Sequence, residues 1–138
     1  MRKITIVLTL LFSLGMYCQE KSIYTEVFDL SINDSFEFED YEIRFIDVTS
    51  DSRCPKAVMC IVAGEANVVL DIYKGSVKIS SNDLRFTPTI YLPNNKGNIY
   101  NSEFIKVTGV ELFPHPNSDN NIPKVDYRLK LLYEEIVE

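Results

Sequence analysis

Two cysteines, Cys54 and Cys60, are separated by five residues in a stretch that joins two segments of alternating character. Apolar and polar side chains alternate over residues 41–45 and again over residues 66–72, which is typical of β-strands. A disulfide between the two cysteines would close a small loop and stabilise the fold by about 2–2.5 kcal/mol on a chain-entropy estimate. We therefore expect the chain to be organised around a disulfide-closed corner between two strands.

The first 18 residues have the layout of a secretory signal peptide. Residues 1–3 supply a basic start, and residues 4–14 form an apolar run that is broken only by Thr and Ser. This run is too short to anchor the chain across a bilayer, which requires about 20 apolar residues. We expect removal of residues 1–18, a single exported domain over residues 19–138, and no transmembrane segment in the mature chain. The expected location is the periplasm, the outer-membrane surface or the extracellular space.

Cys18 leaves two ways of processing open. A signal peptidase accepts a small residue such as Cys18 at the last position before the cut, whereas in a lipoprotein Cys18 would become the acylated first residue. The bulky Tyr17 before it favours ordinary cleavage, and a lipid anchor at Cys18 is the alternative. A single acyl chain would tether the domain without altering its fold. In either case Cys54 and Cys60 remain as a pair, and an oxidising compartment favours their disulfide.

The charge of the expected mature chain excludes some classes of partner. Removal of residues 1–18 takes Arg2 and Lys3 from the 14 basic residues and leaves all 20 acidic ones, so the net charge becomes −8. An acidic domain repels nucleic-acid phosphates and anionic membrane surfaces. We therefore expect no nucleic-acid binding, and we expect an envelope protein or a glycan as the partner.

The pattern of the whole chain predicts an all-β fold. No window has the 3.6-residue period of a helix. Seven or eight short strands separated by Gly, Pro and Asn turns favour an antiparallel two-sheet β-sandwich of immunoglobulin-like size, with a small β-barrel as the alternative. The strands are expected over residues 23–30, 36–38, 41–48, 66–73, 76–79, 86–92, 103–113 and 125–133.

Several residues interrupt the alternation, and each interruption carries its own prediction. Ile46 breaks the period of its strand, which indicates a β-bulge or a strand covered on both faces. The inward face of residues 103–113 changes near Gly109, and a glycine at such a change indicates a bulge or a strand that bends between sheets. Pro88 indicates that its strand lies at an edge or carries a bulge, and residues 80–83 are expected to form a loop. Leu132 is the one apolar residue on the polar face of the last strand.

The cysteine stretch is similar to a known group of sequences. Its Asp-Ser-Arg-Cys-Pro run at residues 51–55, followed by Cys60 and by Ala-Gly-Glu-Ala at residues 63–66, resembles an uncharacterised family of small exported bacterial proteins and lipoproteins. The resemblance covers residues 41–70 well, and Val62 stands where the family usually has Trp. The resemblance implies export and a similar fold, and it implies no chemistry.

The residues around the cysteines have structural and functional interpretations. Redox pairs favour two intervening residues near a helix start, so Cys54 and Cys60 are expected to be structural. Asp51 and Arg53 could bind a ligand, but we expect Asp51 to accept backbone N–H groups within the loop. Arg53 is expected to pair with Asp51, Glu65 or another nearby acid.

Three further candidate sites lie elsewhere in the chain. Asn117, Asp119 and Asn121 place oxygen atoms at alternate positions, as calcium loops do, but the glycine and the bidentate glutamate of an EF-hand are missing. His115 is the only histidine, which excludes a multi-histidine metal site. The Asn33 sequon matches an N-glycosylation acceptor, and bacterial export argues against its modification.

These observations predict a protein without enzymatic activity and without a cofactor. The chain has no Gly-x-Ser-x-Gly nucleophile elbow and no phosphate-binding glycine loop. The first functional hypothesis is a binding or interaction module of the cell envelope that uses loops at one end of the sandwich. The alternatives are a disulfide-stapled loop that acts like the binding surface of a protease inhibitor, and a calcium-modulated module that uses residues 117–121.

Overall fold

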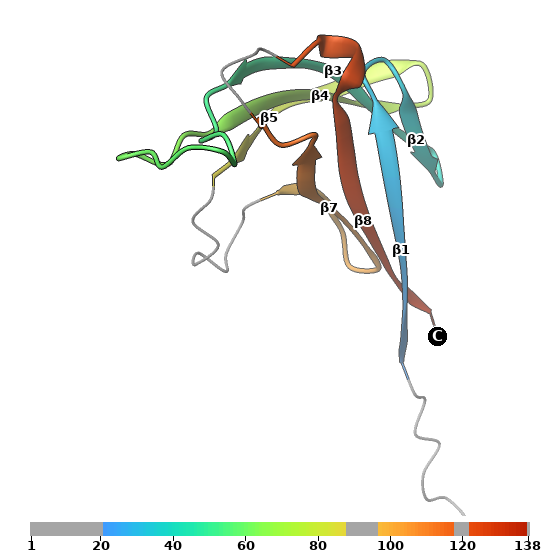
Figure 1. The fold of residues 1–138 in the computed structure, drawn as a ribbon. Coiled ribbons are helices and arrows are strands. Elements are labelled where there is room, and N and C mark those ends of the chain that lie inside the picture. Colours follow the sequence, from blue (N-terminus) through green and yellow to red (C-terminus); the bar gives the residue numbers. More distant parts are fainter. Residues whose placement is uncertain (1–20, 88–96, 118–121, 138) are drawn as a thin grey trace, which may run out of the picture.

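The structure is a computed structural model that describes residues 21–87, 97–117 and 122–137 (Figure 1). In these ranges the chain forms eight strands and one short 3-10 helix. None of the helical structure in these ranges is long or apolar enough to cross a membrane. The elements are β1 (Ser22–Ser31), β2 (Ser35–Phe38), β3 (Tyr41–Asp51), β4 (Ala66–Lys74), β5 (Val77–Phe86), β6 (Asn98–Asn101), β7 (Ile105–Phe113), η1 (Lys124–Asp126) and β8 (Arg128–Val137).

The strands form two antiparallel sheets, with the orders β1-β8-β7-β6 and β2-β3-β4-β5. Consecutive strands are neighbours throughout, either within one sheet or across the two. At one seam the ring centroids of Phe28 in β1 and Phe36 in β2 lie 4.4 Å apart. At the other seam Asn82 of β5 donates a hydrogen bond to the carbonyl of Ile99 in β6 at 3.1 Å. No ladder joins the sheets at these seams, so the predicted β-sandwich is confirmed and the barrel alternative is wrong.

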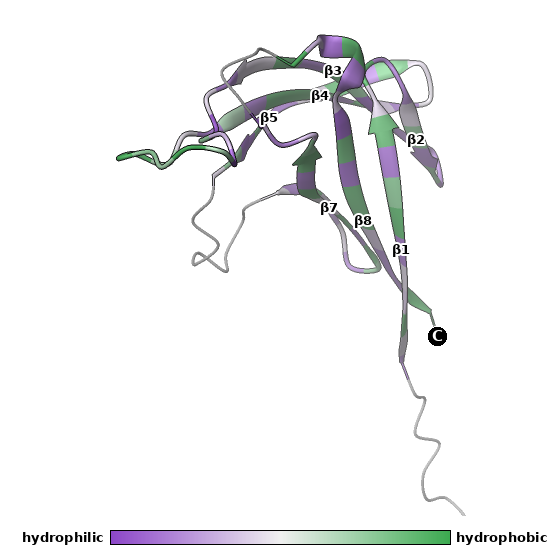
Figure 2. Cartoon of the chain, in the orientation of Figure 1, coloured by the Kyte–Doolittle hydropathy of each residue, from purple (hydrophilic) through white to green (hydrophobic). Residues whose placement is uncertain are grey.

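The core lies between the two sheets and consists of the inward side chains of alternating strand residues. Successive side chains point to opposite faces of a strand, so hydrophobic and hydrophilic residues alternate along β8 (Figure 2). In the absence of Trp, Phe and Tyr rings fill one end of the core, where Phe38 contacts both Tyr41 and Tyr100. The largest fully buried side chains are Phe45, Ile43, Leu70, Leu112, Leu129, Leu131, Val68 and Val107.

Both predicted irregularities coincide with breaks in strand pairing. The register of β3 against β4 shifts between Phe45 and Asp47, which makes Ile46 the bulged residue. The register of β7 against β8 shifts between Gly109 and Glu111. Gly109 also faces β5 closely, since a Cβ atom there would lie 2.3 Å from a methyl carbon of Leu84. A glycine at this bulge therefore lets the two sheets approach each other.

Two expectations about the strands were wrong, and one strand was not expected. Residues 80–83 were expected to form a loop but belong to β5. The strand accommodates the polar Ser81 because its hydroxyl donates to the carboxylate of Asp71 at 2.7 Å. The short strand β6 was not predicted, because its four residues include two Asn. Val125 is 75% exposed in η1, since the chain turns after Pro123 and the strand begins only at Arg128. Most of the strand expected over residues 86–92 lies outside the described residues.

The two faces of β8 give a direct test of the sandwich. Leu131 is fully buried between the sheets and Leu132 is half-buried on the outer face. We expect L131A to lower the free energy of unfolding by about 2–5 kcal/mol because it leaves a cavity in the core. The same truncation in L132A should lower the free energy of unfolding by less than about 1.5 kcal/mol, because the half-buried Leu132 lies outside the core. Urea unfolding followed by circular dichroism measures both, and equal losses would contradict the assignment of the two faces.

Candidate functional site

The candidate site is the cysteine loop, which we define as residues 52–65 between β3 and β4. The loop projects from one end of the sandwich (Figure 1). Cys54 and Cys60 form the predicted disulfide within it. At its base the backbone N–H of Ser52 donates to the carbonyl of Glu65 at 2.8 Å, and the N–H of Glu65 donates to the hydroxyl of Ser52 at 3.1 Å. Gly64 permits this closure, since a Cβ atom there would lie 1.5 Å from the carbonyl oxygen of Ser52.

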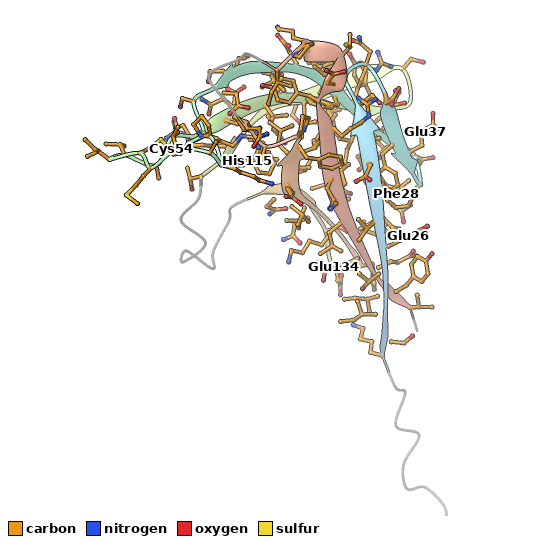
Figure 3. The ribbon with its side chains drawn as sticks, in the orientation of Figure 1. Glu26, Phe28, Glu37, Cys54, His115 and Glu134 are labelled. Carbon is orange, nitrogen blue, oxygen red and sulfur yellow. A yellow bond between two sulfur atoms is a disulfide. The ribbon has the colours of Figure 1, made fainter. Side chains whose placement is uncertain are left out.

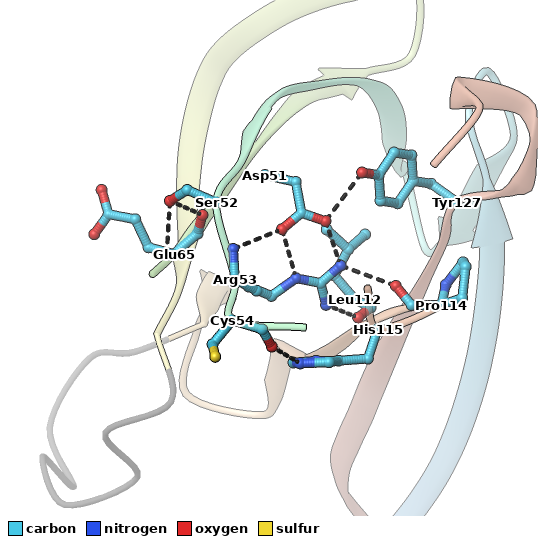
Figure 4. A network of polar contacts seen from close by, with 9 residues as sticks. All are labelled: Asp51, Ser52, Arg53, Cys54, Glu65, Leu112, Pro114, His115 and Tyr127. Carbon is cyan, nitrogen blue, oxygen red and sulfur yellow. Dashed lines mark hydrogen bonds and ion pairs between the residues drawn. The ribbon is translucent and has the colours of Figure 1, made fainter. Parts of the chain in front are cut away.

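A buried ion pair joins Arg53, at the start of the loop, to Asp51, at the end of β3 (Figure 4). The Arg53 guanidinium donates to both carboxylate oxygens of Asp51, from Nε at 2.8 Å and from Nη2 at 2.6 Å. The backbone N–H of Arg53 also donates to this carboxylate at 3.1 Å, as expected for an Asp that organises a turn. Each of the two side chains is only 7% exposed. Buried charges of this kind are stable when they are paired and fully hydrogen-bonded.

The ion pair is held from the opposite sheet as well. Arg53 donates from Nη1 to the carbonyl of Leu112 and from Nη2 to the carbonyl of Pro114 at 2.9 Å. Tyr127 donates its hydroxyl to the carboxylate of Asp51 at 3.0 Å. The hydrogen bonds thereby connect Asp51 and Arg53, at the end of β3, to the end of β7 and to the residue before β8. The network bridges both sheets at the end that carries the cysteine loop.

Two further contacts fix the start of the loop itself. The Nε2 atom of His115 lies 2.9 Å from the carbonyl oxygen of Cys54 (Figure 4). A carbonyl oxygen only accepts hydrogen bonds, so this ring nitrogen carries a proton. The backbone N–H of Lys56 donates to the carbonyl of Pro116 at 3.0 Å. The histidine therefore serves as a support of the loop.

The network sets the ionisation of its two acidic members. Burial alone would raise the pKa of the Asp51 carboxyl, but the hydrogen bonds and charge of Arg53 outweigh burial and hold that pKa below its ordinary value. Burial, together with the hydrogen bond to Asp51, raises the pKa of the Tyr127 hydroxyl to about 12. At neutral pH the site therefore holds an ionised Asp51, a charged Arg53 and a neutral Tyr127. Each of these three side chains is engaged in hydrogen bonds within the network.

The outer part of the loop has the opposite character. Lys56 is the only charged residue between Cys54 and Gly64. The projecting end of the loop is strongly hydrophobic in Figure 2. We call its four exposed large side chains the apolar tip: Val58 (50% exposed), Met59 (100%), Ile61 (104%) and Val62 (77%).

The structure brings together some of the residues singled out from the sequence and separates others. Asp51 and Arg53 pair as expected, but the carboxylate of Glu65 lies on the surface, 3.5 Å from the guanidinium of Arg85. Asn117 is exposed, while the other two residues of the candidate calcium loop lie outside the described residues. In the described part of the chain no three His, Cys, Asp or Glu side chains form a group that could hold a metal ion.

Sequence reasoning missed three groups of the network, one hydroxyl and two backbone carbonyls. Tyr127 was expected as an inward residue of the last strand, and its ring is indeed buried. No sequence signal indicated that its hydroxyl would reach Asp51, 76 residues earlier in the chain. The carbonyl acceptors of Leu112 and Pro114 gave no signal either, because backbone groups are the same at every position.

Comparisons of the chain with family models, with curated protein sequences and with solved structures find no match.

The buried ion pair makes a first prediction about stability. We expect R53M to lower the free energy of unfolding by about 3–5 kcal/mol, because it leaves the Asp51 carboxylate buried without its partner. The matched control is R85M, which removes the exposed pair with Glu65 and should cost about 0–1 kcal/mol. Urea denaturation of both variants measures the difference. A loss for R53M as small as that for R85M would contradict the role of the network.

The lowered pKa of Asp51 makes a second prediction, about acid. A carboxyl whose pKa is lower in the folded state stabilises the fold above its unfolded pKa, near 3.9. That contribution is lost as the pH falls below about 4 and passes through the folded pKa. We expect D51N to be less stable than the wild type at pH 7 but to lose less stability on acidification. Thermal unfolding between about pH 7 and pH 2 measures both curves, and parallel curves would contradict the assignment.

Proposed function

We propose that this protein is an exported, non-enzymatic binding module of the cell envelope, and that the apolar tip of the cysteine loop is its contact surface. The observation that carries the proposal is the exposure of four neighbouring apolar side chains on a loop that is closed by a disulfide and anchored by a buried ion pair. Contiguous exposed apolar groups of this kind mark interaction sites on soluble domains. Export is supported by the basic and apolar character of residues 1–18 and by the disulfide.

The arrangement of the loop favours binding in two ways. Transfer of each large apolar side chain of the tip out of water contributes about 1.5–3 kcal/mol. The loop is already held by its disulfide and by the hydrogen bonds at its base, so little conformational freedom remains to be lost on binding. A convex apolar tip on a rigid base fits a concave apolar pocket of the partner.

The chemistry of the tip favours a protein over a membrane or a glycan as the partner. The expected net charge of −8 after removal of residues 1–18 repels anionic lipid surfaces, and Lys56 is the one cation in the loop between Cys54 and Gly64. The same segment contains no aromatic ring and no polar side chain other than Lys56. Glycans are recognised through hydrogen bonds and ring stacking, for which this tip offers few groups.

An inhibitor of an exported protease is a narrower form of the same proposal. It is favoured by the projecting, disulfide-closed shape of the loop, since a pre-ordered loop can enter a protease cleft at low entropic cost. In this form residues 56–59 would contact the protease. Replacement of residues 56–59 by Gly and Ser should then abolish inhibition of the captured protease, and unchanged inhibition would contradict this form.

The proposal is tested by changing the tip and identifying what contacts it. We expect the variant M59S/I61S/V62S to lose at least about 100-fold in affinity for its envelope partner, because it removes three apolar side chains that become buried against the partner on binding. A photo-crosslinking amino acid at Met59 should yield one main adduct from a detergent extract of the producer's envelope. Mass spectrometry of the adduct identifies the partner, and titration calorimetry with the purified partner measures the affinity.

Matched controls separate the tip from other exposed apolar residues. Val77 and Ile79 in β5 are 66% and 51% exposed and lie outside the loop, so V77S/I79S should retain affinity and a crosslinker at Ile79 should not yield the same adduct. Flotation with phosphatidylcholine and phosphatidylglycerol vesicles tests the membrane alternative. Vesicle binding that is lost in M59S/I61S/V62S would overturn the choice of a protein partner.

A further inference from the structure

Strand β1 has features that the proposed function does not use. Within the described residues β1 pairs only with β8, and no second strand pairs with its other edge, where only the Ser31 end is bonded, to Asp34. Its pairing with β8 runs over ten residues without a register shift. Unpaired strand edges are templates for pairing with another chain, and proteins commonly interrupt them with bulges or Pro. β1 has neither, so its edge is open to pairing.

The other edge strands are less suited to pairing. β2 and β6 have only four residues each. β5 has ten residues, but its pairing with β4 carries a register shift, and its Asn82 is bonded to β6 in the other sheet. In the described part of the chain β1 is thus the long edge with an unbroken register.

The outer face of β1 and β8 carries apolar pairs where a solvent-facing surface would be polar. Ile23 lies directly opposite Ile136, and Val27 lies directly opposite Leu132. Ile23 is 65% exposed and Val27 is 53% exposed. Leu132 is the apolar residue that broke the polar pattern of the last strand in the sequence. Its apolar character is explained if further apolar side chains lie beside this pair on the same face of an extended sheet.

The first half of β1 also projects beyond the rest of the molecule. Its first six residues are exposed, whereas Leu30 near its end is buried in the core. Figure 1 shows β1 and β8 extending as a two-stranded ribbon past the second sheet. In Figure 3 this ribbon, marked by Glu26 and Glu134, lies far from Cys54 and His115. A partner on this ribbon would therefore leave the cysteine loop free.

We propose that β1 is a homodimer interface, in which the β1 strands of two copies pair antiparallel about a two-fold axis at Thr25. In this register Lys21 lies opposite Asp29 of the second copy, and the symmetry repeats this pair. A register centred on Glu26 would instead place two glutamates opposite each other. Opposite charges stabilise directly paired strands and like charges destabilise them. Charge complementarity thus selects the register at Thr25.

The same register joins the apolar pairs of the two copies. Residues that are directly opposite in an antiparallel pair lie on the same face of the sheet. Ile23 therefore lies beside Val27 of the second copy on the outer face, flanked by Ile136 of its own β8 and by Leu132 of the second copy. Two such four-residue apolar rows form by symmetry. The four-stranded sheets of the two copies become one continuous sheet, and their second sheets lie at opposite ends of the shared ribbon.

A self-crosslink tests the two-fold axis. Thr25 lies opposite itself in the proposed dimer, so two cysteines there would have Cα atoms roughly 4.5–5.5 Å apart, which is within the Cα separation that a disulfide can span. We expect the protein carrying T25C, expressed from the full chain and purified after export, to form a covalent dimer under mild oxidation that is separated by reduction. The control I79C places a cysteine on the other long edge strand and should remain monomeric in non-reducing electrophoresis.

Charge exchange tests the register. K21D and D29K should each weaken dimerisation roughly tenfold in sedimentation equilibrium, because each places like charges opposite each other twice. The double variant K21D/D29K should dimerise within about twofold of the wild type. An equimolar mixture of the two single variants should also recover dimers, since each then faces a complementary copy. The mixture tests the register even when the double variant K21D/D29K folds poorly. Far-UV circular dichroism confirms that each single variant is folded.

The proposal is overturned by three results. The first is a wild-type protein that remains monomeric in sedimentation equilibrium at protein concentrations up to about 100-fold higher than those used for crosslinking. The second is crosslinking of I79C that is as efficient as that of T25C. The third is a double variant, or a mixture of single variants, that dimerises as weakly as each single variant alone.

Discussion

The buried pair of Arg53 and Asp51 is the interaction on which the arrangement of this sandwich depends. It lies where β3 ends, and its remaining hydrogen bonds reach the end of β7 and the start of β8. The two sheets share no ladder at their seams, so side-chain contacts must hold their ends together. The apolar core does this over most of the interface, and the ion pair does it at the end that carries the cysteine loop. Because both charges are buried, the geometry that satisfies them is narrowly defined.

The same network explains how a strongly apolar loop can remain ordered in water. The polar groups at its base are satisfied by Ser52, Glu65, His115 and the Pro116 carbonyl. The disulfide closes the segment between, and the apolar tip lies outside the core. The polar base and the apolar tip thus have separate roles, since the base fixes position and the tip is left exposed. This separation is the physical basis of the proposed binding function.

The two surfaces that stand out on the molecule lie at different ends of it. The apolar tip projects from the end that holds the ion pair, and the open edge of β1 extends past the other sheet (Figures 1 and 3). The proposed dimer would present two cysteine loops from one assembly. Two linked binding surfaces raise the overall affinity for a partner that is itself repeated or clustered in an envelope.

The sequence by itself determined most of the strand periodicity and the pairing of the two cysteines, and it indicated both bulges and the partnership of Asp51 with Arg53 among a few alternatives. Each of these depends on side-chain alternation or on groups a few residues apart, which a linear pattern records. Only the tertiary structure decided that Tyr127 and the carbonyls of Leu112 and Pro114 complete the ion pair. It also decided that Val125 leaves the last strand, that residues 80–83 join β5, and that Val27 lies opposite the outward-facing Leu132. These features arise from contacts between distant segments, and such contacts leave no trace in local periodicity.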